Sequence, residues 1–256
     1  EDTGARPCRI APNGIRIPPG EGPSRLPNVT AEVSFAKGWF EVQDEGSQIV
    51  ADLVMAKEGE QILDYCAGGG GKTLALAARM HNRGQIHAYD ADRKRLAPII
   101  ERLRRAGTRN VQVQEQEKQL KNHLGSFDRV LVDAPCTGTG TWRRRPDTKW
   151  RLTQKNLDER VAQQREALEK ASAYVKPGGY LCYVTCSVLP PENQGQVEAF
   201  LDSHRNYELV PAMENWTALF GDGGLRPYST DGKTVTLTPA ATDTDGFFFA
   251  MLRRKG

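Results

Sequence analysis

Two cysteines in this sequence each follow a short apolar run, and an aspartate stands close to one of them. Residues 130–136 read VLVDAPC, which places Asp133 and Cys136 just after the run, and residues 184–187 read VTCS, which gives Cys186 the same setting. A cysteine thiolate is a strong nucleophile, and a carboxyl group or second thiol beside it can hold or deliver a proton. The two segments therefore predict covalent catalysis supported by acid–base chemistry.

The other three cysteines, Cys8, Cys66 and Cys182, are expected to be small buried hydrophobic residues. An odd count of five cysteines with wide spacing argues against a disulfide framework. Cys182 and Cys186 lie close in sequence, but no histidine or second cysteine pair completes a zinc set, so no metal is expected. Free thiols of this kind are typical of a reducing cytoplasm.

Residues 64–73, DYCAGGGGKT, form a glycine-rich segment between an apolar run and a segment of helical composition. Glycines let a backbone approach a ligand closely and present N–H groups at the start of a helix. The phosphate-binding loop of NTPases would need its first glycine where Cys66 stands, which argues against that class. A nucleotide-type cofactor needs an acidic residue about 20 positions further on, and Asp90 meets this requirement. Asp92 is expected to cap the following helix.

The elements that must position these residues alternate between strands and helices. Strands are expected at residues 62–65, 85–89, 111–114, 130–132 and 180–185, and helices at 47–56, 73–80, 93–106, 156–175 and 192–203. Ser47 is expected to cap the first helix, and residues 177–179 (PGG) are expected to stop the fourth. A short strand at 39–42 and a C-terminal hairpin of 234–238 with 247–252 complete the set.

This alternation predicts an α/β fold with a doubly wound, mostly parallel sheet, helices on both faces and a C-terminal antiparallel hairpin. Ligands of such sheets bind at the carboxyl ends of the strands. One rim should therefore collect the polar residues that end the predicted strands: Asp64, Asp90, Asp133, Cys136 and Cys186.

Length and composition point to one catalytic domain preceded by an arm. Six of the 15 prolines fall within residues 1–37, which we interpret as an irregular arm or linker, with residues 38–256 as the catalytic domain. The longest apolar run, 247–252, is far shorter than the roughly 20 residues that span a bilayer, so no membrane partner is expected. The chain opens without a leader sequence and with Glu1 rather than Met, which predicts a cytoplasmic location and a fragment of a longer protein.

The net charge of +3 is mild, but the basic residues are unevenly spread. A cluster within residues 93–109 is expected to be a solvated helix face. A second cluster follows the DAPC segment directly, where local density of this kind suits a phosphate backbone: Arg143, Arg144, Arg145 and Lys149. Trp142 and Trp150 lie in the same stretch and could stack on bases or pack inside the protein.

A thiol, an acid and a nucleotide-type cofactor suit one particular reaction. Carbon 5 of a pyrimidine is a poor nucleophile, but a thiolate that adds to carbon 6 turns the ring into an enamine that can attack an electrophilic methyl group. An acid at N3 eases the addition, and a base must later remove the C5 proton. An amino-methylating enzyme would need no thiol and would carry an Asn/Asp-Pro-Pro-aromatic segment where this chain has DAPC.

Six segments in this order resemble the bacterial Sun-type (Nop/Sun) RNA cytosine-5 methyltransferases: WFEVQDEGSQ, DYCAGGGGKT, LVDAPCTGTG, PDTKW, YVTCSVLPPENQGQVEAFL and DGFFFA. The resemblance covers residues 38–253. It implies a Rossmann-like fold and S-adenosylmethionine as cofactor. It further implies that Cys186 is the nucleophile, that Cys136 assists proton removal and release, and that Asp133 contacts the cytosine ring.

The resemblance also implies how the cofactor is held. The glycine-rich loop would hold its methionine and ribose parts, with Asp64 and Asp133 beside it: Cys66, Ala67, Gly68, Gly69, Gly70, Gly71 and Lys72. Asp90 would bind the ribose hydroxyls. The family usually has Ala-Pro at Gly68-Gly69, so this loop is expected to be looser and its cofactor affinity lower. The family's aspartate at the adenine end is missing, and Glu117 is the expected substitute.

The relatives that look most similar act on small-subunit ribosomal RNA and carry an N-terminal helical RNA-binding domain that is absent here. The resemblance thus implies an RNA partner, 16S ribosomal RNA, with the target base single-stranded or flipped out. A monomer is the expectation for one catalytic domain. Three alternatives stay open: a non-catalytic RNA-binding or ribosome-assembly protein, a DNA cytosine-5 methyltransferase that uses Cys136, and a P-loop NTPase.

Overall fold

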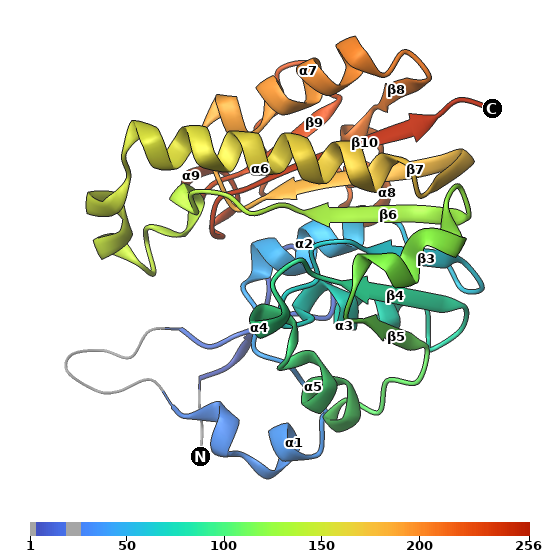
Figure 1. The fold of residues 1–256 in the computed structure, drawn as a ribbon. Helices are drawn as coiled ribbons and strands as arrows, with labels where there is room; N and C mark the ends of the chain where they lie inside the picture. Colours follow the sequence, from blue (N-terminus) through green and yellow to red (C-terminus); the bar gives the residue numbers. More distant parts are fainter. Residues whose placement is uncertain (1–3, 19–26) are drawn as a thin grey trace.

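The computed structural model describes residues 4–18 and 27–256, and an eight-stranded sheet forms their centre (Figure 1). The strand order is β5-β4-β3-β6-β7-β10-β8, and β9 also pairs with β10. The strands from β5 to β7 all run parallel to their neighbours: β3 (Gln61–Asp64), β4 (Gln85–Tyr89), β5 (Val111–Gln114), β6 (Phe127–Asp133) and β7 (Val175–Thr185). The predicted doubly wound, mostly parallel sheet is confirmed.

The C-terminal part of the sheet is antiparallel. β10 (Phe247–Arg254) pairs with β7 on one side and with β8 (Tyr207–Val210) and β9 (Thr234–Leu237) on the other. The predicted hairpin is confirmed, with the short helix α9 (Pro239–Thr242) in its connection. Phe248 is the register partner of Thr185. The residues just before β10 therefore lie beside the carboxyl end of β7, where Cys186 follows.

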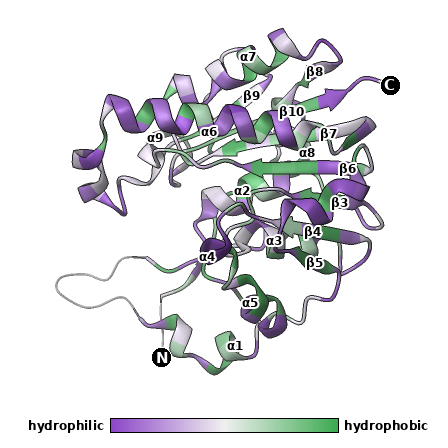
Figure 2. Ribbon diagram, in the orientation of Figure 1, coloured by the Kyte–Doolittle hydropathy of each residue, from purple (hydrophilic) through white to green (hydrophobic). Residues whose placement is uncertain are grey.

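Apolar residues cover both faces of the sheet, as a buried parallel sheet requires. Along β7, Cys182 and Val184 pack with α2 (Glu45–Leu53), α3 (Gly71–Arg79) and α8 (Ala212–Phe220), whereas Leu181 and Tyr183 pack with α6 (Gln154–Ser172) and α7 (Gln194–Ser203). Figure 2 shows the hydrophobic residues concentrated in the strands, while α4 (Arg93–Leu96) is hydrophilic. Two layers of helices thus hold the strand ends in fixed positions.

Short helices complete the fold at the edges of the site. α5 (Ile99–Arg105) packs on the sheet through Ile99 and Leu103. Short 3-10 helices lie along the connections: η1 (Val29–Ala31), η2 (Glu117–His123), η3 (Thr139–Thr141), η4 (Pro146–Arg151) and η5 (Pro190–Glu192). Two of these helices, η3 and η5, directly follow the segments that carry Cys136 and Cys186.

Several predicted elements differ from the structure. Residues 39–42 form no strand, and the cap of α2 is Asp44, whose side chain accepts from Gly46 N, rather than Ser47. The predicted helix 93–106 is divided into α4 and α5 around Pro98, which has no N–H to donate to the preceding turn. The PGG segment 177–179 lies inside β7, at a register shift against β6, and α6 ends earlier, at Ser172.

The N-terminal segments are irregular but make specific contacts. β1 (Arg6–Pro7) and β2 (Ile15–Arg16) form a two-stranded antiparallel sheet, and α1 (Val33–Ala36) follows η1. Arg16 reaches the core through an ion pair with Glu45 of α2 at 2.6 Å. Residues 1–3 and 19–26 of the predicted arm lie outside the described residues, and the boundary after residue 37 stays a prediction. Within the described ranges, no helix has the length and apolarity needed to cross a membrane.

Candidate active site

The glycine turn after β3 is shaped by left-handed backbone conformations and close packing. Gly68 and Gly70 have φ of +50° and +81°, a region that non-glycine residues rarely adopt. A Cβ at Gly70 would lie 2.4 Å from Cγ1 of Ile99 on α5. The turn ends where α3 begins, at Gly71. Glycine is therefore required at residue 70 both by conformation and by space.

Asp90 lies at the end of β4, as predicted, and faces this turn. Its Oδ2 accepts from Gly68 N at 2.9 Å and its Oδ1 from Asp92 N at 2.8 Å. Each carboxylate oxygen has a second lone pair, so Asp90 can still accept from a ligand hydroxyl. Asp92 caps α4 by accepting from Lys94 N, which confirms its predicted capping role.

Asp64 lies behind the turn rather than on its open side. It is fully buried, its Oδ2 accepts from Thr73 Oγ1 at 2.7 Å, and its Oδ1 has no partner among the described residues. Burial raises the pKa of Asp64 to about 7. The structure thus places this predicted cofactor residue where it supports Thr73 and the first turn of α3.

A cleft of about 750 Å³ opens beside the turn and reaches the two cysteines. One wall comes from the strand ends and includes Cys66, Asp90, Asp133, Cys136 and Cys186. The facing wall is α6, which contributes Arg160, Gln163, Glu166, Ala167 and Lys170. Tyr65, Tyr89 and Arg95 also line it. The predicted convergence of these strand ends on one rim is therefore observed, apart from Asp64.

Cys136 and Cys186 form the centre of the rim, with their Sγ atoms 3.2 Å apart. The hydrogen bond that Cys186 accepts from Cys136 lowers the pKa of Cys186. Donation of the same hydrogen bond, together with burial, holds the pKa of Cys136 well above its ordinary value. The pair can therefore hold one thiolate, on Cys186, and one thiol, on Cys136.

Lys72 and Asp133 flank this thiol pair. Nζ of Lys72 lies 2.7 Å from Oδ2 of Asp133, and the lysine is 7% exposed. The positive charge of Lys72 also favours a lower pKa at Cys186, while the charge of Asp133 opposes it. Lys72, which was expected to hold cofactor with the glycine loop, thus reaches the chemistry end of the cleft.

The remaining cysteines stay protonated thiols. Cys182 is buried, and burial raises its pKa to about 12. Cys8 and Cys66 are only partly buried by comparison, which differs from the prediction, although desolvation raises the pKa of each. All five cysteines are free thiols.

Glu117, expected at the adenine end of the cofactor, is engaged by a tyrosine. Its Oε1 accepts from Tyr65 Oη at 2.8 Å, and its Oε2 lies 3.9 Å from Nζ of Lys170. The cleft lining among the described residues includes Tyr65 and Lys170 but not Glu117. Glu117 therefore does not line the cleft itself, but it orients Tyr65, which does.

The predicted RNA-binding residues fall into two groups. Arg143 and Arg144 bind the fully buried Asp245, with Nε–Oδ distances of 2.8 and 2.6 Å. Arg145 and Lys149 are exposed, and Nζ of Lys149 lies 4.7 Å from the ring centroid of Trp150, which is 80% exposed. The second pair is free to meet a phosphate backbone, whereas the first pair fixes the loop after Cys136.

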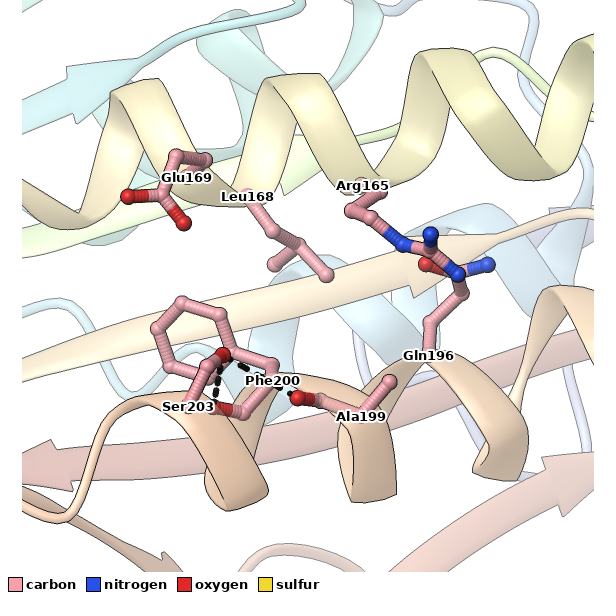
Figure 3. Close-up of a pocket in the computed structure, with 7 residues that line it drawn as sticks. All are labelled: Arg165, Leu168, Glu169, Gln196, Ala199, Phe200 and Ser203. Atoms are coloured by element: carbon pink, nitrogen blue, oxygen red, sulfur yellow. Dashed lines mark hydrogen bonds between the residues drawn. The ribbon is translucent and has the colours of Figure 1, made fainter.

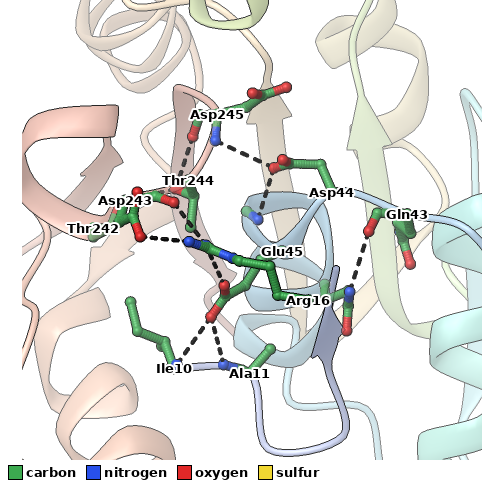
Figure 4. Close-up of polar contacts among 12 residues, drawn as sticks. Ile10, Ala11, Arg16, Gln43, Asp44, Glu45, Thr242, Asp243, Thr244 and Asp245 are labelled. Atoms are coloured by element: carbon green, nitrogen blue, oxygen red, sulfur yellow. Dashed lines mark hydrogen bonds and ion pairs between the residues drawn. The ribbon is translucent and has the colours of Figure 1, made fainter. Parts of the chain in front are cut away.

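Asp245 belongs to a polar cluster that sequence reasoning missed (Figure 4). Its N–H donates to Asp44, the cap of α2, and the neighbouring Asp243 binds Arg16. Next to it, Gly246 N donates to Gly140 O at 2.7 Å and Gly140 N donates to Cys186 O at 3.0 Å. Residues 247–252 were predicted as a strand, but Asp245 was noticed only as the first residue of the DGFFFA segment in the resemblance, and its position just before that apolar strand was the one available signal.

Glu192 is the second residue that sequence reasoning missed. It is fully buried and accepts from Thr137 and Ser187, the residues that follow the two cysteines. The signal available was a lone carboxylate six residues after Cys186 in the segment PPEN.

A smaller hollow lies between α6 and α7, lined by residues from both helices (Figure 3). Its volume is about 80 Å³, and Ser203 at its edge donates back to Ala199 and Phe200 of its own helix. Its lining residues include neither Cys136 nor Cys186, so this hollow is separate from the thiol pair.

The fold and the site define the class first: a Rossmann-like fold of S-adenosylmethionine-dependent methyltransferases, with two cysteines at the rim. Residues 51–253 match the family described as 16S rRNA methyltransferase RsmB/F. The chain belongs to this family, which confirms the resemblance drawn from its motifs.

Individual relatives and solved structures support this family assignment. The chain is 38% identical to ribosomal RNA small subunit methyltransferase B of Serratia proteamaculans, over 88% of this chain and 49% of the relative. The crystal structure of PH0851 has a TM-score of 0.85 and 32% identity, with coverage of 98% of this chain and 54% of that one. NSun6 from Pyrococcus horikoshii, solved with SFG, has a TM-score of 0.77 and 30% identity, with coverage of 90% and 57%. The chain spans about half the length of the curated relatives that it matches.

Proposed function

We propose that this chain transfers a methyl group from S-adenosylmethionine to carbon 5 of a cytosine in 16S ribosomal RNA, through a covalent bond between Cys186 and carbon 6. The contact between two unequal thiols, 3.2 Å apart at the rim of the cleft, carries this proposal. A methyltransferase acting on an amino group or a hydroxyl would have no use for such a pair. The names of the relatives support ribosomal RNA as the substrate.

The residues around the cleft fit the cofactor. The turn at Gly68–Gly70 has no side chains to obstruct a ligand, and a Cβ at Gly70 would not fit. Asp90 retains acceptor capacity suited to ribose hydroxyls, and Tyr65 and Tyr89 supply aromatic surface to the cleft. Bound there, S-adenosylmethionine supplies an electrophilic methyl group. The binding of SFG by the Pyrococcus NSun6 supports this assignment.

The reaction begins with the thiolate of Cys186, whose Sγ forms a bond to carbon 6 of the cytosine. The electron pair of the C5–C6 double bond moves into the ring and makes carbon 5 nucleophilic. Asp133, next to Lys72, lies where it can contact N3 or the amino group at C4 and stabilise the ring during addition. Lys72 keeps Asp133 oriented and offsets its charge near Cys186.

Release requires removal of the proton on carbon 5. As that proton leaves, its C–H electron pair re-forms the C5–C6 double bond and the S–C6 bond breaks, which returns the thiolate to Cys186. Cys136 is the neighbouring group that assists this step. Once Cys186 is bonded to carbon 6, the Cys136 thiol can lose its proton to solvent through the open cleft. The Cys136 thiolate then takes the proton from carbon 5, because its Sγ lies in contact with the sulfur that leaves.

The exposed side of the rim is proposed to bind RNA. Arg145 and Lys149 lie on the loop that continues from Cys136 and can contact phosphates, while Trp150 offers a face for an unpaired base. The target cytosine must leave its helix for carbon 6 to reach Cys186.

All the proposed catalytic residues come from one chain, so we propose a monomer. Its free thiols suit the reducing cytoplasm.

A tritium-release assay tests the position of methylation. A 16S ribosomal RNA transcript carrying tritium at carbon 5 of its cytosines is incubated with the chain and methyl-labelled S-adenosylmethionine. We expect one tritium released to water for each methyl group incorporated. Methyl incorporation without tritium release would contradict the proposal, because it would place the methyl group on nitrogen or ribose.

A further inference from the structure

Glu192 is a fully buried carboxylate that lies between the two cysteine loops. Its Oε1 accepts from Thr137 N at 2.8 Å and from Gln164 Nε2 at 2.9 Å, and its Oε2 accepts from Thr137 Oγ1 at 2.5 Å and from Ser187 Oγ. Thr137 follows Cys136 and Ser187 follows Cys186. One side chain thus connects the two loops that carry the thiols.

Neighbouring hydrogen bonds make this connection rigid. Gln164 of α6 also donates to Pro135 O at 3.0 Å, just before Cys136. Asn193, next to Glu192, donates to Ser187 O at 2.9 Å, just after Cys186. Because Glu192 is bonded to both loops, while Gln164 supports one loop and Asn193 the other, the separation of the thiols depends on Glu192 remaining in place.

The carboxylate of Glu192 accepts hydrogen bonds, but no positively charged side chain among the described residues offsets its charge. Its four donors are all neutral groups. A buried charge is tolerated only when hydrogen bonds replace its hydration. The negative potential that remains acts on the thiol of Cys136, whose pKa it helps to raise after the hydrogen bond with Cys186 and burial.

The two thiols therefore face different charges. Cys186 faces the ammonium group of Lys72 from α3 and the carboxylate of Asp133 at the end of β6, and it interacts with Arg144 of the loop beyond Cys136. Cys136 faces Cys186 and Glu192, and it also interacts with the neutral phenol of Tyr183. A proton shared by the two sulfurs is drawn toward the side of Glu192.

We propose that Glu192 is a positioning residue that holds the two thiols in contact and keeps their shared proton on Cys136, which leaves the thiolate on Cys186. The inference rests on the proposed function for the roles of the two cysteines, and it adds the group that makes those roles unequal.

A single substitution can separate the charge of Glu192 from its shape. In Glu192→Gln, the amide oxygen can still accept from Thr137 N and Gln164 Nε2, while the amide N–H groups can donate to the hydroxyls of Thr137 and Ser187, which can turn to accept. Glu45→Gln is the matched control, because Glu45 is 5% exposed and accepts from Ile10 N, Ala11 N and Arg16.

The test measures alkylation of the two thiols in the free protein. The reduced chain is treated with iodoacetamide between pH 6 and pH 10, and peptide mapping by mass spectrometry gives a rate for each cysteine. We expect Cys186 to react faster than Cys136 in the unchanged chain. In Glu192→Gln we expect the ratio of the two rates to fall about tenfold, the effect of one pKa unit, because Cys136 ionises more readily.

An unchanged ratio in Glu192→Gln would overturn the proposal, and so would an equal fall in Glu45→Gln, which would show a general loss of packing. If Glu192→Gln does not fold, Ser187→Ala removes one link of the bridge and leaves the charge. It should then raise the alkylation rate at both cysteines without a fall in their ratio. A fall in the ratio in Ser187→Ala as large as the one expected for removing the charge would also overturn the proposal.

Neither RNA nor cofactor enters this experiment. A chain that shows the expected alkylation pattern but releases no tritium from RNA would contradict the proposed function and leave the role of Glu192 standing. If the chain methylates RNA but the ratio of alkylation rates is unaltered in Glu192→Gln, the proposed function stands and the role of Glu192 is contradicted.

Discussion

The two ends of the cleft are held by different forces. At the glycine turn, the contacts are steric and local: residues 64–73 follow one another, and Asp90 closes the turn through Gly68 N. At the thiol end, segments that are far apart in the chain are joined by two buried carboxylates, Glu192 and Asp245. We therefore expect the glycine turn to be disrupted by substitutions that add a side chain, and the thiol end by substitutions that remove a charge.

The two carboxylates of the thiol end also differ from each other. Asp245 binds two arginines, so its charge is offset and its contribution is to hold the loop after Cys136 against the segment before β10. Glu192 has neutral donors only, so its charge remains effective at the thiols. The same kind of buried group thus stabilises the loop in one place and polarises the reactive pair in the other.

The largest effect is expected from Asp245→Asn. Removal of the charge leaves Arg143 and Arg144 without their buried partner, and we expect the free energy of unfolding to fall by about 3 kcal/mol. Urea denaturation measures this change. Asp243→Asn is the control, since the Asp243 side chain is 47% exposed, and its loss should cost at most about 1 kcal/mol. Equal losses of unfolding free energy in the two variants would show that the burial of Asp245 adds nothing to its ion pairs.

A smaller loss is expected from Gly70→Ala at the other end of the cleft. The left-handed φ and the contact with Ile99 together should lower the free energy of unfolding by about 2 kcal/mol and weaken cofactor binding measurably. Gly107→Ala has a similar φ of +64° with nothing within 4 Å of its Cβ, so it should cost only about 1 kcal/mol and leave cofactor binding intact. Calorimetric titration with S-adenosylmethionine measures the binding, and unimpaired binding in Gly70→Ala would argue against a steric turn.

Lys72→Met tests which end of the cleft this lysine serves. Its charge helps to lower the pKa of Cys186, so its removal should raise that pKa and leave less thiolate near neutral pH. We expect the methyl-transfer rate at pH 7 to fall about tenfold for a rise of one pKa unit, with the difference closing as the pH increases. A pH–rate profile checks this, and a loss that is the same at every pH would assign Lys72 to cofactor binding instead.

The smallest effect is expected at the exposed basic residues. Arg145→Ala and Lys149→Ala should each weaken RNA binding modestly and reduce the slope of log affinity against log salt by about one per residue removed. Neither should change the unfolding free energy, since both side chains are exposed. An unaltered salt slope would show that RNA approaches the rim from another side.

The strand–helix alternation, the parallel sheet and the rim were predictable from the sequence because strand periodicity and glycine turns are local signals. The cap of α2 was assigned to Ser47 rather than Asp44 because both are good capping residues three positions apart, and only the packing of α2 decides between them. The division of the predicted helix 93–106 at Pro98 was likewise undecided by the sequence, since a proline can either kink a helix or divide it.

The support of the site was less predictable. Arg143 and Arg144 read as phosphate ligands because nothing in the sequence says that Asp245, about a hundred residues away, lies beneath them. Glu192 was overlooked for the same reason, because two of its donors, on Thr137 and Gln164, are 55 and 28 residues away in the sequence. Groups that act on the ligand are visible as motifs, whereas groups that hold those motifs together become visible only in the fold.

The most direct test of the central claim is a covalent trap. The unchanged chain, Cys136→Ala and Cys186→Ala are each incubated with S-adenosylmethionine and 16S ribosomal RNA and are then separated on a denaturing gel. We predict a protein–RNA band that accumulates only in Cys136→Ala, because Cys186 can still form the bond to carbon 6 while release is impaired. A band that accumulates only in Cys186→Ala would contradict it, since Cys136 would then be the nucleophile.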